Sequence, residues 1–299
     1  MSNEIWNLAR NQAFLVHRPA AWLRVTGEDA LTFLQGQITN DLRNLETEPA
    51  VYGLWLNHKG RALGDGFVGR AAGGGYWIGS YFTEGAALKA HLEAFIVADD
   101  VTIADATAEM GGATLFGEGA RAAVPPAGVV VFSGRRGVEP AVEWGFAAEW
   151  EPAVRAALAG WREASAEEVE RWRIAARVPA VPRDIGPSDL PNEGELETVA
   201  ISYTKGCYLG QEVMARLKNL GQVRRKLVRV RGAGAAPTVP AALQQEERKV
   251  GELRSAVADG EGFAGLALVT LLNVRGAAPW RLAPEAGGGE VEPIDWPTA

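Results

Sequence analysis

KGCYLGQE, residues 205–212, is the most informative segment of the 299-residue chain and contains its single cysteine, Cys207. The glycines on either side allow the backbone to turn tightly and to approach a ligand closely. We expect a helix to begin at about Gln211, with its N-terminus near the thiol. A helix N-terminus and the nearby Lys205 both favour a thiolate. The pattern therefore indicates a reactive cysteine, although a lone cysteine is also typical of a small buried apolar residue.

A basic stripe follows this segment. Residues 216–231 contain no acidic side chain and seven basic ones, namely Arg216, Lys218, Arg224, Arg225, Lys226, Arg229 and Arg231. Such a stripe is complementary to a polyanion. The formal net charge of -7, however, argues against a protein whose whole surface binds nucleic acid. The alternation from Lys226 to Arg231 equally indicates a strand whose charged residues face water.

Upstream of the segment, the apolar pattern predicts both helices and strands. One helix is predicted at about 27–39, begun by Thr26 and Asp29, and a second is predicted after Thr83 as its cap. Ser165 and Glu168 form the pattern of a capping box, which predicts a third helix that ends before Pro179. Strands are predicted at 12–18, 21–25, 51–57, 66–70, 76–82 and 101–103.

The C-terminal part has a different pattern. Short strands are predicted at 226–231, 250–257 and 263–272, which suits a small barrel, and a long loop is predicted at 232–249. The fold class is therefore α+β. We expect a body over residues 1–222, a small C-terminal β-barrel over 223–282 and a flexible tail over 283–299.

Composition limits the class of protein. A hydrophobic content of 47% is enough for a sizeable core, and length favours two domains. The sequence contains neither an apolar run long enough for a membrane span nor the pattern of a secretory signal, so we expect a cytoplasmic protein without membrane contact. One cysteine cannot form an internal disulfide or supply the several thiolates of a stable iron-sulfur or zinc site. We therefore predict no metal site.

The segment KGCYLGQE and its continuation to Arg225 resemble the signature of the YgfZ family. Two upstream segments fit the same family in the same order, FLQGQITND at 33–41 and NHKGR at 57–61. The family is related to the glycine-cleavage T-protein and includes the mitochondrial factor needed for late iron-sulfur assembly. Because independent motifs agree in order and context, the chain is identified as a member.

This resemblance implies a GcvT-like body that binds tetrahydrofolate in a central opening, followed by a small barrel. It implies support of iron-sulfur enzymes, including those that modify transfer RNA, with the cysteine of the signature required. Folate and iron-sulfur client enzymes are then the expected partners, together with a transfer RNA contact. Cations of the basic stripe are expected to bind the folate glutamate tail, whether single or polyglutamylated.

The resemblance and the residue types give a set of candidate site residues. We assign catalytic roles to Cys207, Lys205 and Asp65. Cofactor-binding roles are assigned to seven residues: Trp172, Arg173, Tyr208, Gln211, Glu212, Arg224 and Arg225. Trp172 is explained equally well as a core residue on a helix face, and Asp65 as the cap of a turn.

Two alternative functions remain open. Aminomethyl transfer to tetrahydrofolate, the reaction of the T-protein, relies in that family on an Asp-Asp pair, where this chain has Gly64-Asp65. A second departure is Arg177, where the family usually has glycine. The other alternative is a non-catalytic module that binds folate or transfer RNA and does not need Cys207. The sequence leaves open whether the chain is an enzyme.

Overall fold

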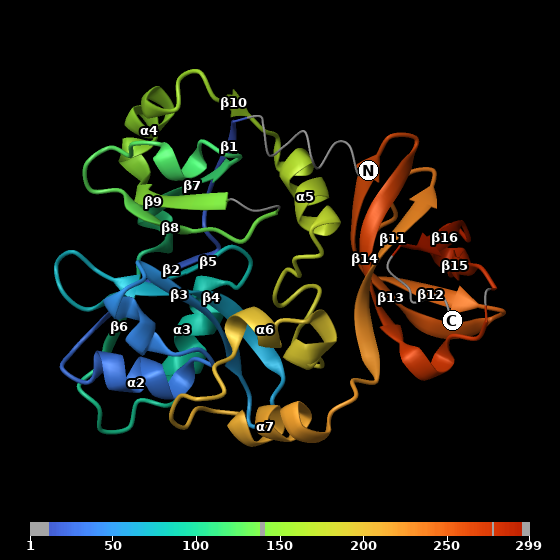
Figure 1. The fold of residues 1–299 in the computed structure, drawn as a ribbon, viewed down its shortest axis with the longest axis horizontal. Helices are drawn as coiled ribbons and strands as arrows, with labels where there is room; N and C mark the ends of the chain where they lie inside the picture. Colours follow the sequence, from blue (N-terminus) through green and yellow to red (C-terminus); the bar gives the residue numbers. More distant parts are fainter. Residues whose placement is uncertain (1–11, 138–140, 277, 295–299) are drawn as a thin grey trace.

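The computed structural model describes residues 12–137, 141–276 and 278–294 of the 299-residue chain. Two five-stranded sheets lie side by side, and a closed six-stranded barrel stands apart from them across the helix α5 (Figure 1). The predicted α+β class with a small C-terminal barrel is confirmed. None of the helices in the described parts has the length and apolar character needed to cross a membrane.

The first sheet has the order β3-β4-β5-β2-β6, and all its neighbouring strands are antiparallel. It is built from β2 (Ala21–Thr26), β3 (Ala50–Leu56), β4 (Ala62–Arg70), β5 (Tyr76–Ser80) and β6 (Thr102–Asp105). Two helices, α2 (Ala30–Gln37) and α3 (Gly85–Glu93), supply Leu34 and Leu88 to a core that also includes the fully buried Trp55. The burial of these apolar side chains is what holds helices and sheet together.

The second sheet has the order β10-β1-β7-β9-β8. Its strands are β1 (Ala13–His17), β7 (Met110–Phe116), β8 (Val130–Ser133), β9 (Ala141–Ala147) and β10 (Arg162–Glu163), and α4 (Glu151–Ala157) lies beside them. Trp22 and Trp77 of the first sheet stack with ring centroids 4.8 Å apart, and Trp77 contacts Phe132 of β8. An aromatic cluster therefore joins the two sheets.

The connection to the barrel runs through α5 (Ala166–Ala175), α6 (Glu197–Ala200) and α7 (Gln211–Leu220). The capping box predicted at the start of α5 is confirmed, since Ser165 and Glu168 each accept from the other's backbone N–H. The barrel has the strand order β11-β14-β13-β12-β15-β16. These strands are β11 (Arg225–Ala233), β12 (Ala241–Gln245), β13 (Arg248–Asp259), β14 (Gly262–Thr270), β15 (Trp280–Leu282) and β16 (Glu290–Pro293).

The structure corrects the prediction of a flexible tail over 283–299. Residues 290–293 form β16, which pairs with both β11 and β15 and places Val291 in the barrel core. The glycines at 287 and 288 have positive φ and follow a short 3-10 helix, Pro284–Ala286, in the connection between β15 and β16. The predicted loop at 232–249 is likewise wrong in part, because β12 lies within it. Residues 295–299 of the predicted tail lie outside the described residues.

Two predicted helix caps are also wrong. The residue before α2 is Asp29, whose side chain makes no capping hydrogen bond. The residue before α3 is Glu84 rather than Thr83. The hydroxyl of Thr83 points elsewhere, to Asp65 and to the carbonyl of Val181.

Arg177 ends α5 in the left-handed conformation, with φ of 53°. Its N–H donates to the carbonyl of Ile174 at 3.0 Å, and the next N–H, of Val178, donates to the carbonyl of Arg173 at 3.0 Å. This is the Schellman arrangement, in which glycine is the preferred residue. The glycine usual in the family therefore has a conformational reason, and Arg177 adopts the same backbone at a cost of about 1–2 kcal/mol.

We predict that Arg177→Gly raises the free energy of unfolding by about 0.5 kcal/mol. Relief of the left-handed strain, roughly 1–2 kcal/mol, exceeds the 0.4–1 kcal/mol of added chain entropy that glycine gives the unfolded state. Urea unfolding measures the difference. Arg177→Ala is the control: it removes the same ion pair with Glu195 but keeps the strain, so it should give no gain. Equal stability of the two variants would contradict this account.

Candidate functional site

Lys205 joins two of the signature segments. Its ammonium group donates to the carbonyls of Gln35 and Ile38 at 2.6 Å and of Asn40 at 2.9 Å, so all three of its protons are used. Burial lowers the pKa of Lys205 to about 8. The side chain predicted to be catalytic thus lies against the turn at the end of α2 and holds residues 35–40 to the cysteine segment.

Cys207 is exposed, whereas residues on both sides of it are buried. Lys205 is anchored as described, and Tyr208 packs into an apolar cluster with Leu54 and Leu56 of β3. Burial raises the pKa of Tyr208 to about 12. The two buried residues fix the segment at either end of the Gly206-Cys207 dipeptide. The thiol is therefore presented to solvent on a tethered loop rather than packed in the core.

The third signature segment, residues 57–61, packs against the start of α7. The side chain of Asn57 accepts hydrogen bonds from the N–H groups of Lys59 and Arg61 and so closes the turn after β3. A Cβ on Gly210 would lie 2.8 Å from the carbonyl of Asn57, so the approach of the two loops needs this glycine. Gln211 and Glu212, both predicted to bind cofactor, begin α7 at the same place; Gln211 is half-buried and Glu212 is exposed.

Asp65 lies in a second, buried environment on β4. Its carboxylate accepts from the hydroxyl of Tyr52 at 2.7 Å and lies 3.2 Å from that of Thr83. Burial raises the pKa of Asp65 to about 6, against the hydrogen bonds and a nearby Arg135 that act to lower it. The Thr83 hydroxyl has one proton and two acceptors, Asp65 and the carbonyl of Val181 at 3.1 Å. The three residues predicted to be catalytic share no hydrogen bond in the described structure.

The site has one carboxylate, Asp65, because position 64 is a glycine where the T-protein family has a second aspartate. A Cβ at position 64 would lie 2.5 Å from the side-chain methyl of Thr83, a distance that real contacts do not reach. Thr83 in turn accepts from the backbone N–H of Asp65 at 3.0 Å. An aspartate at position 64 therefore requires Thr83 to move and its hydrogen bonds to break.

Two arginines that the sequence analysis missed extend the Asp65 cluster. The guanidinium of Arg135 lies 4.5 Å from the ring centre of Tyr52, and that of Arg136 lies 4.1 Å from the ring centre of Tyr81. The Nε atoms of both arginines are buried and have no hydrogen-bond partner. The sequence signal that could have identified them is the run GRRG at 134–137, because glycines around paired arginines suit a tight, ligand-facing turn.

A chain of hydrogen bonds connects Arg136 to His17 and His17 to Glu143. Arg136 donates to Nδ1 of His17 at 3.2 Å, so the ring hydrogen lies on Nε2, which donates to Glu143 at 2.5 Å. Glu143 also accepts from Tyr81 and Thr114. Burial raises the pKa of Glu143, but His17 and Arg136 more than offset this and lower it. Glu143 is thus ionised, and residues of β1, β7 and β9 hold the polar cluster between the two sheets.

The other predicted cofactor-binding residues are engaged within the protein. Trp172 packs edge-on against Phe116 in an apolar cluster. The five N–H groups of Arg173 all donate, to Glu170, Asp184, Ser255 and the carbonyl of Val178. Trp172 is therefore part of the core of the body, whereas Arg173 lies at the junction between body and barrel.

Ion pairs within the protein neutralise part of the basic stripe. Arg225 pairs with Asp189 at 2.9 Å and Glu193 at 2.7 Å. Lys226 pairs with Glu195 and Arg231 with Glu292. Four cations of the stripe are exposed, namely the paired Arg231 together with Arg216, Lys218 and Arg224. Within the parts of the chain that the structure describes, no three His, Cys, Asp or Glu side chains converge in a way that could hold a metal ion.

We predict that Asp65→Asn changes how stability depends on pH. The folded-state pKa of about 6 lies above the ordinary value of 3.8, so between these values the folded protein binds more protons than the unfolded chain. The free energy of unfolding therefore falls as pH rises through this window, by on the order of 2–3 kcal/mol. Asn cannot titrate, so the free energy of unfolding of the variant, measured by urea unfolding, should rise relative to that of the wild type between pH 4 and pH 7. A pH-independent difference would contradict the assignment.

Comparisons with known proteins show the family and the fold of the chain. The sequence matches the family described as the GCVT N-terminal domain over residues 3–128. The human mitochondrial iron-sulfur cluster assembly factor IBA57 is 30% identical over 278 residues, which cover 85% of this chain and 76% of that protein. The tRNA-modifying protein YgfZ of Klebsiella pneumoniae is 27% identical over 295 residues, 91% of this chain and 89% of that protein.

Among solved structures, the glycine cleavage system aminomethyltransferase T from Bartonella henselae superposes with a TM-score of 0.76. The match covers 97% of this chain and 86% of that one at 17% sequence identity, so it shows a shared fold and nothing of the reaction. The likeness to the two assembly and modification proteins spans body and barrel together. This chain belongs to the family of YgfZ and IBA57, built on the GcvT-like fold.

Proposed function

We propose that the chain is a cytoplasmic, tetrahydrofolate-binding accessory factor that supports the assembly or repair of iron-sulfur enzymes, including enzymes that modify transfer RNA. Its relatives are described as an iron-sulfur cluster assembly factor and a tRNA-modifying protein. The observation that carries the folate part is the pair Arg135 and Arg136, whose Nε atoms are buried without a partner beside the Asp65 cluster. Buried donors of this kind are costly unless a ligand or water satisfies them.

The residues of the cluster fit a reduced folate. A pterin ring is flat and has a polar edge with both donors and acceptors, so it suits aromatic faces flanked by fixed polar groups. Tyr52 and Tyr81 supply the aromatic faces, and the Asp65 carboxyl with a pKa of about 6 can accept or donate at neutral pH. Arg135 and Arg136 would bind the acceptor edge or a carboxylate. The folate, when bound, would supply a carrier for one-carbon groups.

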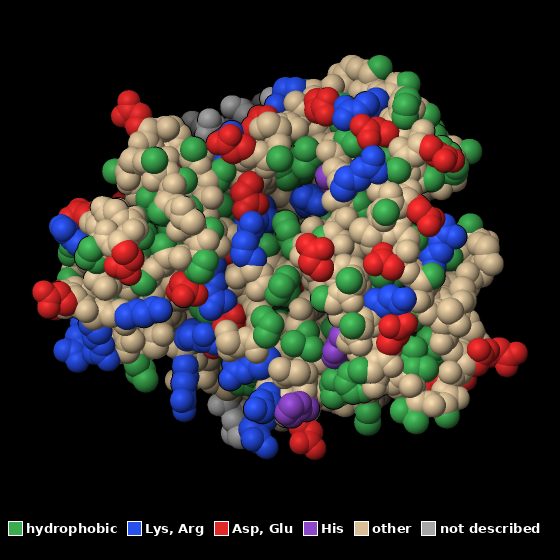
Figure 2. All heavy atoms as spheres, turned by 180° about the vertical axis from the view of Figure 1, so that it is seen from behind, with side chains coloured by type: hydrophobic (Ala, Val, Ile, Leu, Met, Phe, Trp, Pro, Cys, Tyr) green, Lys and Arg blue, Asp and Glu red, His purple; other side chains and the backbone are tan. Residues whose placement is uncertain are grey.

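The exposed cations of the basic stripe suggest where the glutamate tail of a bound folate would lie. Figure 2 shows basic side chains along the middle of one face, from a central hollow to its lower edge. Ion pairs offset Arg225, Lys226 and Arg231, so Arg216, Lys218 and Arg224 are the members of the basic stripe suited to a polyglutamate tail or to transfer RNA. Exposed cations of this kind add affinity that high salt screens.

Cys207 is the group proposed to act on client enzymes. An exposed thiol on an anchored loop can reach a partner's surface, whereas a buried one cannot. Aminomethyl transfer is less favoured, because Gly64 stands where the T-protein has a second carboxylate and a Cβ there would lie 2.5 Å from the methyl of Thr83. The site therefore suits folate recognition with the thiol as a separate functional group.

We predict that tetrahydrofolate binds the wild-type protein and that Arg135→Gln or Arg136→Gln weakens binding at least ten-fold. Each change removes charged donors from a buried site, where such bonds are worth about 1.5–3 kcal/mol. Isothermal titration calorimetry measures the dissociation constant. The control is Arg24→Gln, an exposed arginine on the outer face of β2, which should bind like the wild type. Absence of heat up to millimolar ligand, or equal losses in all three variants, would exclude this site.

We predict that Cys207→Ser abolishes support of iron-sulfur enzymes while folding and folate affinity stay close to wild type. Serine nearly keeps the volume of cysteine but removes its soft, nucleophilic sulfur, and an exposed position tolerates the change. Complementation of a deletion strain measures the function, with urea unfolding and folate titration on the same variant. Full complementation by the serine variant would make the protein a folate-binding scaffold, and loss of folding would make Cys207 structural.

A further inference from the structure

A buried histidine, His17, lies at the end of β1 with 10% of its side chain exposed. Across the sheet it pairs with Gly112 of β7, where a Cβ would lie 2.4 Å from the imidazole ring. The ring therefore occupies a space that any larger residue at position 112 would fill. Tyr81 contacts the ring edge-on, with the ring centres 6.0 Å apart. Packing thus holds the imidazole in one place.

The hydrogen bonds of His17 determine its protonation. Glu143 is buried and ionised, so its carboxylate can only accept, and it accepts from Nε2 of His17 at 2.5 Å. The same carboxylate accepts from the hydroxyls of Tyr81 at 3.0 Å and Thr114 at 2.7 Å. Arg136 can only donate, and it donates to Nδ1 of His17 at 3.2 Å. Because one ring nitrogen donates and the other accepts, His17 is neutral, with its hydrogen on Nε2.

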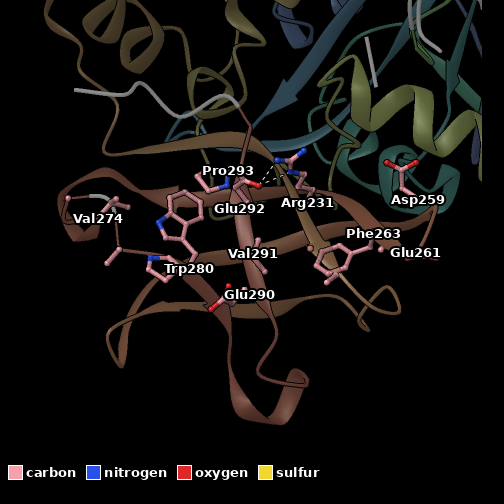
Figure 3. Close-up of a pocket in the computed structure, with 16 residues that line it drawn as sticks. Arg231, Asp259, Glu261, Phe263, Val274, Trp280, Glu290, Val291, Glu292 and Pro293 are labelled. Carbon is pink, nitrogen blue, oxygen red and sulfur yellow. Dashed lines mark hydrogen bonds and ion pairs between the residues drawn. The ribbon is translucent and has the colours of Figure 1, made fainter. Parts of the chain in front are cut away.

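A neutral partner orients Arg136 without neutralising it. Arg231, which lines a pocket at the end of the barrel, shows the contrasting arrangement, because its guanidinium is paired with the carboxylate of Glu292 at 2.6 Å (Figure 3). Among the described residues, no carboxylate forms an ion pair with Arg136, and its Nε is buried without a partner. The positive charge and the Nε–H of Arg136 are therefore available to a ligand.

The surroundings of Arg136 restrict its guanidinium before any ligand binds. The guanidinium carbon lies 4.1 Å from the ring centre of Tyr81 and 5.6 Å from that of Phe82. These rings limit the position of the group, and the hydrogen bond to His17 fixes its direction. An arginine that is ordered in advance loses less side-chain entropy when a ligand binds.

We propose that His17 is a positioning residue of this site. It holds the guanidinium of Arg136 in one orientation, so that the free Nε–H and the positive charge can bind a hydrogen-bond acceptor of the folate. His17 does not contact the ligand itself, since both of its ring nitrogens are engaged within the protein. This inference rests on the proposed folate site and assigns a role to a residue outside it.

Two substitutions of His17 separate positioning from a purely structural role. His17→Asn keeps an acceptor oxygen close to the place of Nδ1, whereas His17→Leu has no acceptor, and neither variant reproduces the Nε2–H that Glu143 accepts. In calorimetric titrations with tetrahydrofolate, the dissociation constant of His17→Leu should rise about ten-fold and that of His17→Asn less than about three-fold. His58→Asn changes an exposed histidine and should bind like the wild type. Equal weakening in the two His17 variants overturns the proposal.

A substitution beside the ring tests the same geometry without a change to His17. Gly112→Ala adds a Cβ that would lie 2.4 Å from the imidazole, so the ring must move and Arg136 loses its acceptor. We expect the affinity for tetrahydrofolate to fall about as far as in His17→Leu. Gly73→Ala is the matched control, because a Cβ at Gly73 would have no atom within 4 Å. Unaltered affinity in Gly112→Ala would contradict the assignment.

Nitrogen NMR measures the positioning of Arg136 without any ligand. The chain contains three histidines, so the signals of His17 are those that disappear in His17→Asn, and they should show the neutral ring with its hydrogen on Nε2. The guanidinium signals of Arg136, identified by their loss in Arg136→Gln, should show slow rotation in the wild type and in His17→Asn but fast rotation in His17→Leu. Fast rotation in all three proteins overturns the proposal. If tetrahydrofolate does not bind the wild type, the proposed function is wrong, and the NMR result alone decides whether His17 positions Arg136.

Discussion

The buried guanidinium of Arg173 holds the two halves of the protein together. It lies on α5, and its hydrogen bonds reach Asp184 in the segment after α5 and Ser255 on β13 of the barrel. Ser255 also donates to Asp184 at 2.5 Å, which closes the triangle. Loss of one partner from a buried ion pair costs about 3–5 kcal/mol, because the remaining charge stays buried and unpaired. The position of the barrel relative to the body therefore depends on this group.

The same segment connects the barrel to the Asp65 cluster. Asp189 forms ion pairs with Arg225 of β11 and Arg254 of β13, so the segment 178–195 is attached to the barrel at several points. At its other end, the carbonyl of Val181 accepts from Thr83, which also contacts Asp65. Because the Thr83 hydroxyl carries one proton, an ionised Asp65 competes with Val181 for it. The protonation of one buried carboxyl is thereby linked to the segment that positions the barrel.

Local signals in the sequence predicted part of the local structure, since the capping box of Ser165 is confirmed but the caps at Thr26 and Thr83 are wrong. They did not predict long-range pairing. The capping box of Ser165 and the cysteine signature involve residues a few positions apart, and both were found. Arg173 was read as a ligand-binding cation because no sequence pattern reveals that Asp184 and Ser255 lie beside it. For the same reason the sequence does not show that Arg225 pairs with Asp189 and Glu193. Residues 287–289 resembled a loose end, since three glycines in a row describe a tail and a tight turn equally well until β16 is seen to pair with β11.

Several residues of the signature around Cys207 make contacts within the fold that explain their identity. Lys205 satisfies three carbonyls, Tyr208 fills an apolar cluster, and Gly210 permits close contact with the turn at Asn57. Each of these has a structural reason for its identity. Cys207 has none: it is exposed, although cysteine is among the most frequently buried residue types. Its exposure on a loop that Lys205 and Tyr208 anchor is the observation on which its proposed action on client enzymes rests.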